Sequence, residues 1–229
     1  MYTEFTDCLP KLAAGLPNCP AALKLQALRE AWRTWCEESG TWRDVRTLDT
    51  VARQPDYPLP NATRLTEGNS SITGEVVRVS KVNLRTTDDV AWSRDGFEVF
   101  PDYWRVEPRG DYAIATGQDE ITGSSTPPSS YTLHFLPEYA PQWDVTKGLV
   151  VKIIYKPLID APFQAPTVFN AWAEGILAKT RAILASTPDE PYFNEKFAAA
   201  QEKNYRRLLN RAKWAVLGQG RPNAVGMQA

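Results

Sequence analysis

Hydrophobic positions recur at helical spacing near both ends of the chain, whereas the long middle lacks that period. Helical periodicity covers Ala21 to Glu38 and Pro166 to Leu217. Between Trp42 and Leu158, short runs of β-branched and aromatic residues alternate instead with turn residues. The pattern predicts an α+β fold, in which helices from the two ends form a bundle and an antiparallel β-rich module is inserted between them.

The same pattern predicts the domain boundaries. We expect residues 1–41 and 159–229 to form the helical bundle domain, residues 42–158 the inserted β domain, and residues 219–229 a flexible, polar C-terminal tail. Each helix has a single apolar face and would not be stable alone, so the helices should bury one shared core. The residues predicted for that core are Leu25, Leu28, Trp32, Trp35, Phe169, Trp172, Ile176, Phe197, Leu208 and Leu209.

Capping residues suggest where the helices begin and end. Asn18 is the predicted N-cap of the first long helix, with Pro20 in its first turn, and Gly40 is its predicted stop. A shorter helix should precede it and end near Ala14. The last helix is predicted from about Tyr192 to Leu217, with Phe193, Phe197, Tyr205, Leu208, Leu209, Ala212 and Val216 on its apolar side.

The β-rich middle divides into short extended runs separated by turn signals. Strands are predicted within Trp42–Thr50, Glu75–Thr87, Phe97–Glu107, Tyr112–Thr116, Tyr131–Leu136 and Leu149–Tyr155. The proline-rich run Gln54–Pro60 should be extended, as a strand exit or an approach to another layer. Arg94-Asp95-Gly96 is a hairpin signal, and the Gly-, Ser- and Pro-rich run Gly117–Ser130 should be a flexible loop.

Composition is typical of a soluble globular protein, with 43% hydrophobic and 23% charged residues. No apolar run approaches the roughly 20 residues that span a bilayer, so no membrane association is expected. The first residues are acidic where a secretory signal would be basic, which predicts synthesis and retention in a cytoplasm. Cys8, Cys19 and Cys36 have no zinc or redox spacing and should be free, largely buried thiols.

No catalytic or cofactor motif is visible. His134 is the only histidine and occupies an ordinary strand position, so we expect a structural role for it. Nucleophile-elbow, zinc-protease and phosphate-loop patterns are absent, and we therefore predict no catalytic residue, no metal ligand and no cofactor. Trp92, Trp104 and Trp143 could form a stacking platform for a sugar or base, although core or subunit-contact roles are favoured.

Charge is distributed unevenly along the chain. Residues 191–229 contain seven basic and two acidic residues, for a net charge of +5, whereas the rest of the chain carries −6. A basic end on an acidic body can dock on an acidic partner or near phosphates. The candidate docking residues are Lys203, Arg206, Arg207, Arg211, Lys213 and Arg221.

Two stretches resemble the head-to-tail adaptor proteins of tailed bacteriophages, of the tail tubular protein A type. The first is LPNCPAALKLQALREAWRTWCEESGTWRD, from Leu16 to Asp44, a helix that closes with an aromatic residue and a cysteine before a Trp-led strand. The second lies within Val151 to Lys213 and contains VKIIYKPLIDAP, FNAWAEGILAKTRAIL and FNEKFAAAQEKNYRRLLNRAK, a last strand followed by two helices.

The resemblance implies a non-enzymatic virion protein at the head-tail junction, made in the host cytoplasm. Members form rings, commonly of twelve subunits, that bind the portal protein with the C-terminal region and also bind the next tail or nozzle protein. Genomic DNA would pass through the ring without sequence-specific binding. Two alternatives remain open: a polymer- or glycan-binding β module that uses exposed aromatics, and a hydrolase whose acids converge only in three dimensions.

Overall fold

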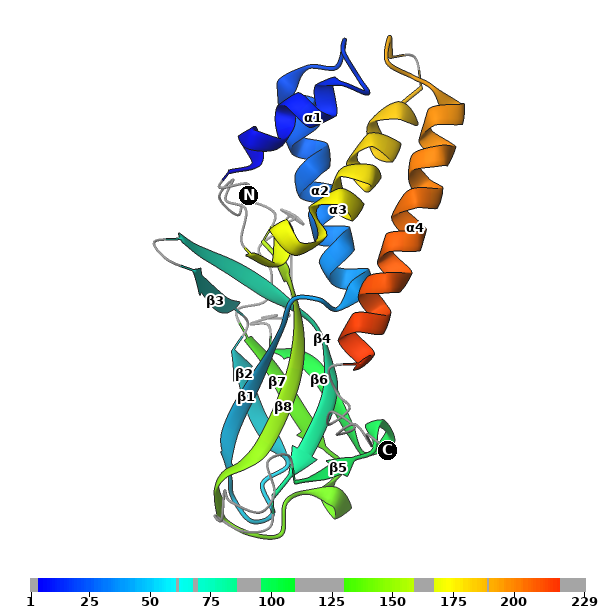
Figure 1. Ribbon diagram of the computed structural model, residues 1–229. Helices are drawn as coiled ribbons and strands as arrows, with labels where there is room; N and C mark the ends of the chain where they lie inside the picture. Colours follow the sequence, from blue (N-terminus) through cyan, green and yellow to red (C-terminus); the bar gives the residue numbers. More distant parts are fainter. Residues whose placement is uncertain are drawn as a thin grey trace, which may run out of the picture. The chain divides into compact units, whose positions relative to one another are not determined.

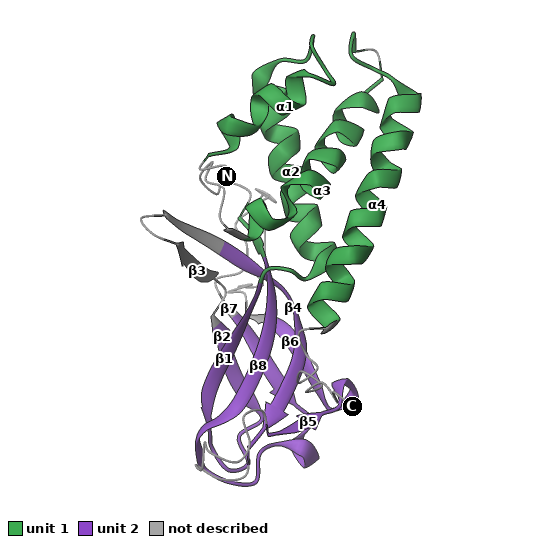
Figure 2. Ribbon diagram, viewed as in Figure 1, with its two compact units in different colours: residues 1–42, 65–73, 156–229 green, residues 43–64, 74–155 purple. Residues whose placement is uncertain are grey.

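The structure is a computed structural model that describes residues 4–60, 62–67, 70–85, 96–109, 130–158, 167–188 and 190–218. The chain divides into two compact units (Figure 2). Residues 1–42, 65–73 and 156–229 make up the helical unit, and residues 43–64 and 74–155 make up the β unit. Terminal helices and antiparallel strands from the middle of the chain confirm the predicted α+β fold.

Segments from both ends of the chain build the helical unit (Figure 1). A one-turn 3₁₀ helix, Phe5–Cys8, runs into α1 (Leu9–Ala13), and α2 covers Ala21–Ser39. From the C-terminal part come α3 (Thr167–Ala185) and α4 (Glu195–Gly218). Helix α3 packs against both α2 and α4, so the first and last parts of the chain share one bundle.

Of the two caps predicted for α2, the structure has the C-terminal one but not the N-terminal one. Gly40 is confirmed as its stop, because it adopts φ 64° in the left-handed region and its N–H donates to the carbonyl of Cys36 over 3.0 Å. The prediction that Asn18 is the N-cap is wrong. Pro20 is the N-cap instead, since its backbone stays extended at ψ 143° and the first helical residue is Ala21. Asn18 lies in the preceding turn, where the N–H of Cys19 donates to the carbonyl of Leu16.

Aromatic rings form the centre of the helical core. Trp32 is 1% exposed and stacks on Trp42 with a centroid distance of 6.0 Å. Phe5 and Phe169 each meet the Trp32 ring edge-on, at 5.3 and 5.8 Å. The predicted core residues Leu28, Trp32, Trp35, Phe169, Ile176 and Leu209 are buried, and Leu25, Trp172, Phe197 and Leu208 are half-buried.

The β unit contains most of two antiparallel sheets. The first has the order β1-β8-β4-β3, with β5 also paired to β4, and the second has the order β2-β7-β6. The bounds of the strands are β1 Arg43–Thr50, β2 Asp56–Pro60, β3 Ala62–Glu67, β4 Ser70–Leu84, β5 Phe97–Val99, β6 Trp104–Arg109, β7 Ser130–Phe135 and β8 Val145–Pro157. In the described part of 43–155, the only helical turns are the 3₁₀ turns Pro101–Tyr103 and Pro137–Tyr139.

Hydrogen bonds connect the two sheets. The hydroxyl of Tyr57 in β2 donates to the carbonyl of Val51, just after β1, over 3.2 Å. The indole N–H of Trp104 in β6 donates to the carbonyl of Val99 in β5 over 3.1 Å. These bonds give the Tyr57 hydroxyl and the Trp104 indole N–H partners in a region of buried apolar residues, where an unpaired donor would be unfavourable.

Several predicted features lie outside the described residues: the strand Tyr112–Thr116, the loop from Gly117 up to residue 129, and Arg94-Asp95 of the hairpin signal. Ser130, predicted as the last loop residue, is the first residue of β7.

Candidate docking face on the last helix

Helix α4 begins three residues later than its apolar pattern predicted. Asn194 is the residue before the helix, and its side-chain Oδ1 accepts a hydrogen bond from the N–H of Phe197 over 3.0 Å. The N–H of Asn194 donates to the carbonyl of Ala185, which ties the start of α4 to the end of α3. Phe193 therefore precedes the helix and is 48% exposed, so its predicted place on the apolar side is wrong.

One side of α4 is held against the bundle by apolar and polar contacts. Ala198, Tyr205, Leu209 and Ala212 are buried there. The Tyr205 hydroxyl donates to a carboxylate oxygen of Glu38 over 2.9 Å. Burial, and then this hydrogen bond, raise the pKa of Tyr205 well above its usual range, so its hydroxyl stays protonated.

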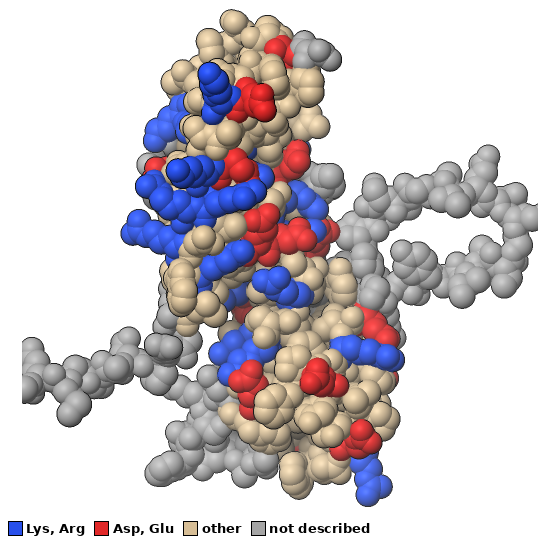
Figure 3. Space-filling view, turned by 90° about the vertical axis from the view of Figure 1, so that its right-hand side faces the viewer, with Lys and Arg blue, Asp and Glu red and all other residues tan. Residues whose placement is uncertain are grey.

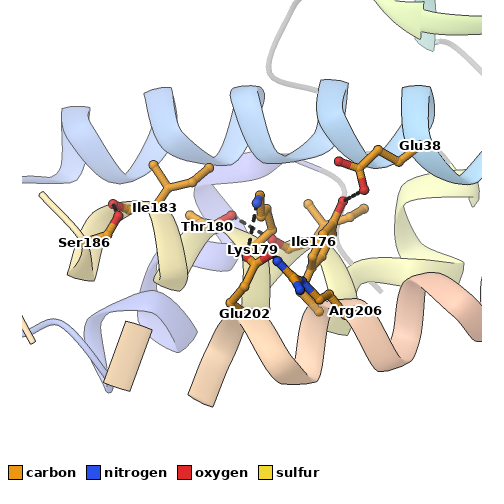
Figure 4. Close-up of polar contacts among 9 residues, drawn as sticks. Glu38, Ile176, Lys179, Thr180, Ile183, Ser186, Glu202 and Arg206 are labelled. Atoms are coloured by element: carbon orange, nitrogen blue, oxygen red, sulfur yellow. Dashed lines mark hydrogen bonds and ion pairs between the residues drawn. The ribbon is translucent and has the colours of Figure 1, made fainter. Parts of the chain in front are cut away.

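A small ion network fixes the rotation of α4 relative to α3 (Figure 4). Glu202 lies between two cations: its Oε2 is 3.1 Å from Nζ of Lys179, and its Oε1 is 3.2 Å from Nε of Arg206. Nζ of Lys179 also lies 4.8 Å from the centroid of the Tyr205 ring. The buried side of α4 thus has a defined register, which in turn defines the residues that face outward.

The outward side of α4 is strongly basic. The helix has six basic and two acidic residues, for a net charge of +4. Figure 3 shows Lys and Arg side chains gathered on the face that α4 presents, with acidic groups beside them. The residues Lys203, Arg206, Arg207, Arg211 and Lys213 are all exposed. The structure therefore brings five of the six predicted docking residues onto one helix, and the sixth, Arg221, lies outside the described residues.

Two large apolar side chains continue this basic face toward the end of α4. Trp214 is 73% exposed and Leu217 is 65% exposed. Eleven residues make about three helical turns and seven make about two, so Trp214 lies on the same side of the helix as Lys203 and Arg207. It is about 16 Å further along the helix than Lys203 and about 10 Å further along than Arg207. We call Lys203, Arg206, Arg207, Arg211, Lys213, Trp214 and Leu217 the α4 face.

Sequence reasoning missed Trp214 and Leu217, although a signal for them was present. The buried positions Tyr205, Leu209, Ala212 and half-buried Val216 follow the helical period, and Trp214 falls on the opposite side of that stripe. An outward-facing tryptophan beside cations is the composition of many interface hot spots.

Other candidates from the sequence lie in the β unit. His134 and Asp56 are opposite each other in β7 and β2, and Nδ1 of His134 lies 2.5 Å from Oδ1 of Asp56. Trp104 is half-buried and Trp143 is 54% exposed, whereas Trp92 lies outside the described residues.

No group of three or more His, Cys, Asp or Glu among the described residues could hold a metal ion. Cys8, Cys19 and Cys36 are free and buried, as predicted. Burial raises the pKa of the Cys8 thiol to about 11. No helix in the described part of the chain is both long and apolar enough to cross a membrane.

No protein-family model matches the chain, and no curated protein sequence is similar enough to be counted as a relative.

Proposed function

We propose that the protein is a ring-forming head-to-tail adaptor of a tailed bacteriophage, and that the α4 face docks on an acidic surface of the portal protein. In this proposal the protein is a structural component of the virion and not an enzyme. Twelve subunits form a closed ring through repeated head-to-tail contacts, genomic DNA passes through the channel, and a tail or nozzle protein binds the other side.

The observation that carries the proposal is the composition of the α4 face. Cations steer an acidic partner over a distance of about 8 Å at physiological salt, and an exposed tryptophan supplies contact area once the partner has arrived. Arg206 is partly neutralised by Glu202, whereas Lys203 and Arg211 are exposed along the same helix. Repetition of the face around a ring would convert weak single contacts into strong binding.

Charge reversal at Arg206, Arg207 and Arg211 to Glu tests the electrostatic part. We expect association with purified portal to slow by at least about tenfold at low salt, and the difference to shrink as salt rises. The matched control reverses three exposed basic residues of the β unit, Arg78, Arg105 and Lys147, and changes the net charge by the same amount. If the control slows association equally, total charge and not the α4 face governs docking.

Trp214→Ala tests the apolar part separately. Because Trp214 is 73% exposed, the variant should fold normally. If Trp214 anchors the interface, its removal should raise the rate at which the portal complex dissociates, at every salt concentration. A loss of about 2 kcal/mol of binding free energy corresponds to an increase of about thirtyfold. Deletion of residues 219–229, which include Arg221, should also weaken binding at any salt.

Mass photometry of the protein alone and with portal tests the ring. A discrete species of closed stoichiometry supports an adaptor. Two results together would refute the proposal: the protein stays monomeric in both conditions, and the charge-reversed and Trp214→Ala variants bind portal as well as the wild type does.

A further inference from the structure

The β unit contains a second candidate site, a cavity of about 370 Å³. Its walls come from the end of β4, from β5 and the 3₁₀ turn after it, and from the segment 138–143 that precedes β8. All of these segments belong to the β unit, so the cavity is formed within one compact unit. A volume in this range is typical of sites that hold a small molecule or a few residues of a peptide.

Exposed aromatic side chains converge on this cavity. Phe97 is 50% exposed, Phe100 66%, Tyr139 38% and Trp143 54%, and all four belong to the lining. They are all of the exposed large aromatic side chains in the described part of the β unit. Leaving that much aromatic surface in water is unfavourable, and its concentration at one concave place indicates a binding site.

The aromatic walls are preformed. The rings of Tyr103 and Tyr139 stack with a centroid distance of 3.7 Å and an interplanar angle of 8°. Phe100 meets the Tyr103 ring edge-on at 6.1 Å. The N–H of Leu136 donates to the carbonyl of Tyr103 over 3.0 Å, which ties the two 3₁₀ turns that carry these rings to each other. A ligand would therefore meet a rigid aromatic groove.

Most polar side chains of the lining already have partners within the protein. Glu98 is ion-paired to Lys81 at 2.8 Å, and the Gln142 amide donates to the carbonyl of Ala140 over 2.7 Å. Glu138 is exposed and makes no ion pair with another described residue. A sugar ring needs several free polar groups that converge on its hydroxyls, which this lining does not offer.

We propose that this cavity binds an extended, proline-containing peptide segment of a partner protein, with a basic residue next to the proline. Proline-rich segments hold a stiff extended conformation, and grooves lined by aromatic rings recognise them because little entropy is lost. The exposed carboxylate of Glu138, one of the lining residues, is complementary to a lysine or arginine of that segment. The other two charged side chains of the lining are engaged within the protein, Glu98 with Lys81 and Arg85 with the carbonyl of Lys147. This site belongs to the β unit, whereas the α4 face belongs to the helical unit, and the proposal does not depend on the adaptor function.

The experiment uses the full-length protein and arrays of peptides of about six residues. One array has a fixed Pro-Pro pair with every amino acid in turn beside it, and a matched array has Ala-Ala in place of the pair. We expect binding to the proline array only, strongest with a flanking Lys or Arg. The best peptide is then measured by calorimetry against the wild type and its variants.

Phe100→Ala and Trp143→Ala should each lower the affinity for that peptide by at least about tenfold. Phe193→Ala, which removes a phenylalanine of similar exposure from the helical unit, should leave the affinity unchanged. The Glu138→Gln variant should bind peptides with Lys or Arg beside the proline pair no more tightly than peptides with Gln there. It should still prefer Pro-Pro peptides to Ala-Ala peptides. Equal binding to both arrays, binding to neither, or binding to an oligosaccharide array in their place would each overturn the proposal.

Discussion

Gly175, in the middle of α3, is predicted to be required by the packing of Trp35. A Cβ atom added at Gly175 would come within 2.6 Å of Cη2 of Trp35, and even closer to Cζ3. Trp35 is 0% exposed and its ring also contacts Trp172 and Tyr205, so it has no space into which to move. The close approach of helix backbone and indole ring thus depends on the absence of a side chain.

The expected magnitude for Gly175→Ala combines two opposing effects. Alanine is favoured over glycine in a helix interior by about 1 kcal/mol. Overpacking a buried contact costs roughly 1–3 kcal/mol, and we take about 2 kcal/mol because the ring is rigid. The free energy of unfolding should therefore fall by about 1 kcal/mol, even though the helix propensity improves.

A double-mutant cycle with Trp35→Leu makes the prediction sharp. Without the indole ring the clash is absent, so Gly175→Ala should raise the free energy of unfolding by about 1 kcal/mol in that background. The coupling between the two positions is then about 2 kcal/mol, measured by urea unfolding followed by circular dichroism at 222 nm. Stabilisation by Gly175→Ala in the wild-type background would refute the reasoning.

Three further predictions concern buried groups of the helical unit. Trp32→Ala should lower the free energy of unfolding by about 3–5 kcal/mol, because it removes a buried ring. Phe193→Ala, the exposed control, should change it by no more than about 0.5 kcal/mol. Equal losses for the two variants in urea unfolding would contradict the placement of Trp32 in the core. Tyr205→Phe removes the hydrogen bond to Glu38 and should lower the free energy of unfolding by about 1 kcal/mol. A double-mutant cycle with Glu38→Ala, which removes the acceptor, would contradict this if it showed no coupling. With a pKa of about 11, the Cys8 thiol should be about one part in a thousand ionised at pH 8. Its labelling in the native protein should be slow and should rise about tenfold per pH unit, in contrast to rapid labelling in denaturant.

Local patterns in the sequence determined the element types. A helical apolar period followed by glycine was enough to place the end of α2 at Gly40, because only a left-handed residue there lets the final carbonyls be satisfied. The change from helical period to alternating β-branched residues near Trp42 likewise identified the α+β fold. The basic stripe of α4 was also readable, because charged positions at helical spacing share a face.

Capping and strand limits were less readable, because several nearby residues can compete for one role. Asn18 has the better N-cap side chain, but the extended backbone of Pro20 decided where α2 starts. The start of α4 moved to Glu195 for a similar reason, since Asn194 caps the helix and is anchored to Ala185. The hydrogen bond from Asn194 to Ala185 is a contact between two helices, which no local pattern contains.

Only the tertiary structure decided how distant segments meet. Phe97, Phe100, Tyr139 and Trp143 are scattered positions in the sequence, and they become one cavity because strand pairing and two 3₁₀ turns bring their segments together. The contact of Gly175 with the ring of Trp35 likewise exists only because α3 packs against α2. A linear sequence records which side chains are apolar or charged, whereas close approach between residues far apart in the chain depends on the complete packing of the fold.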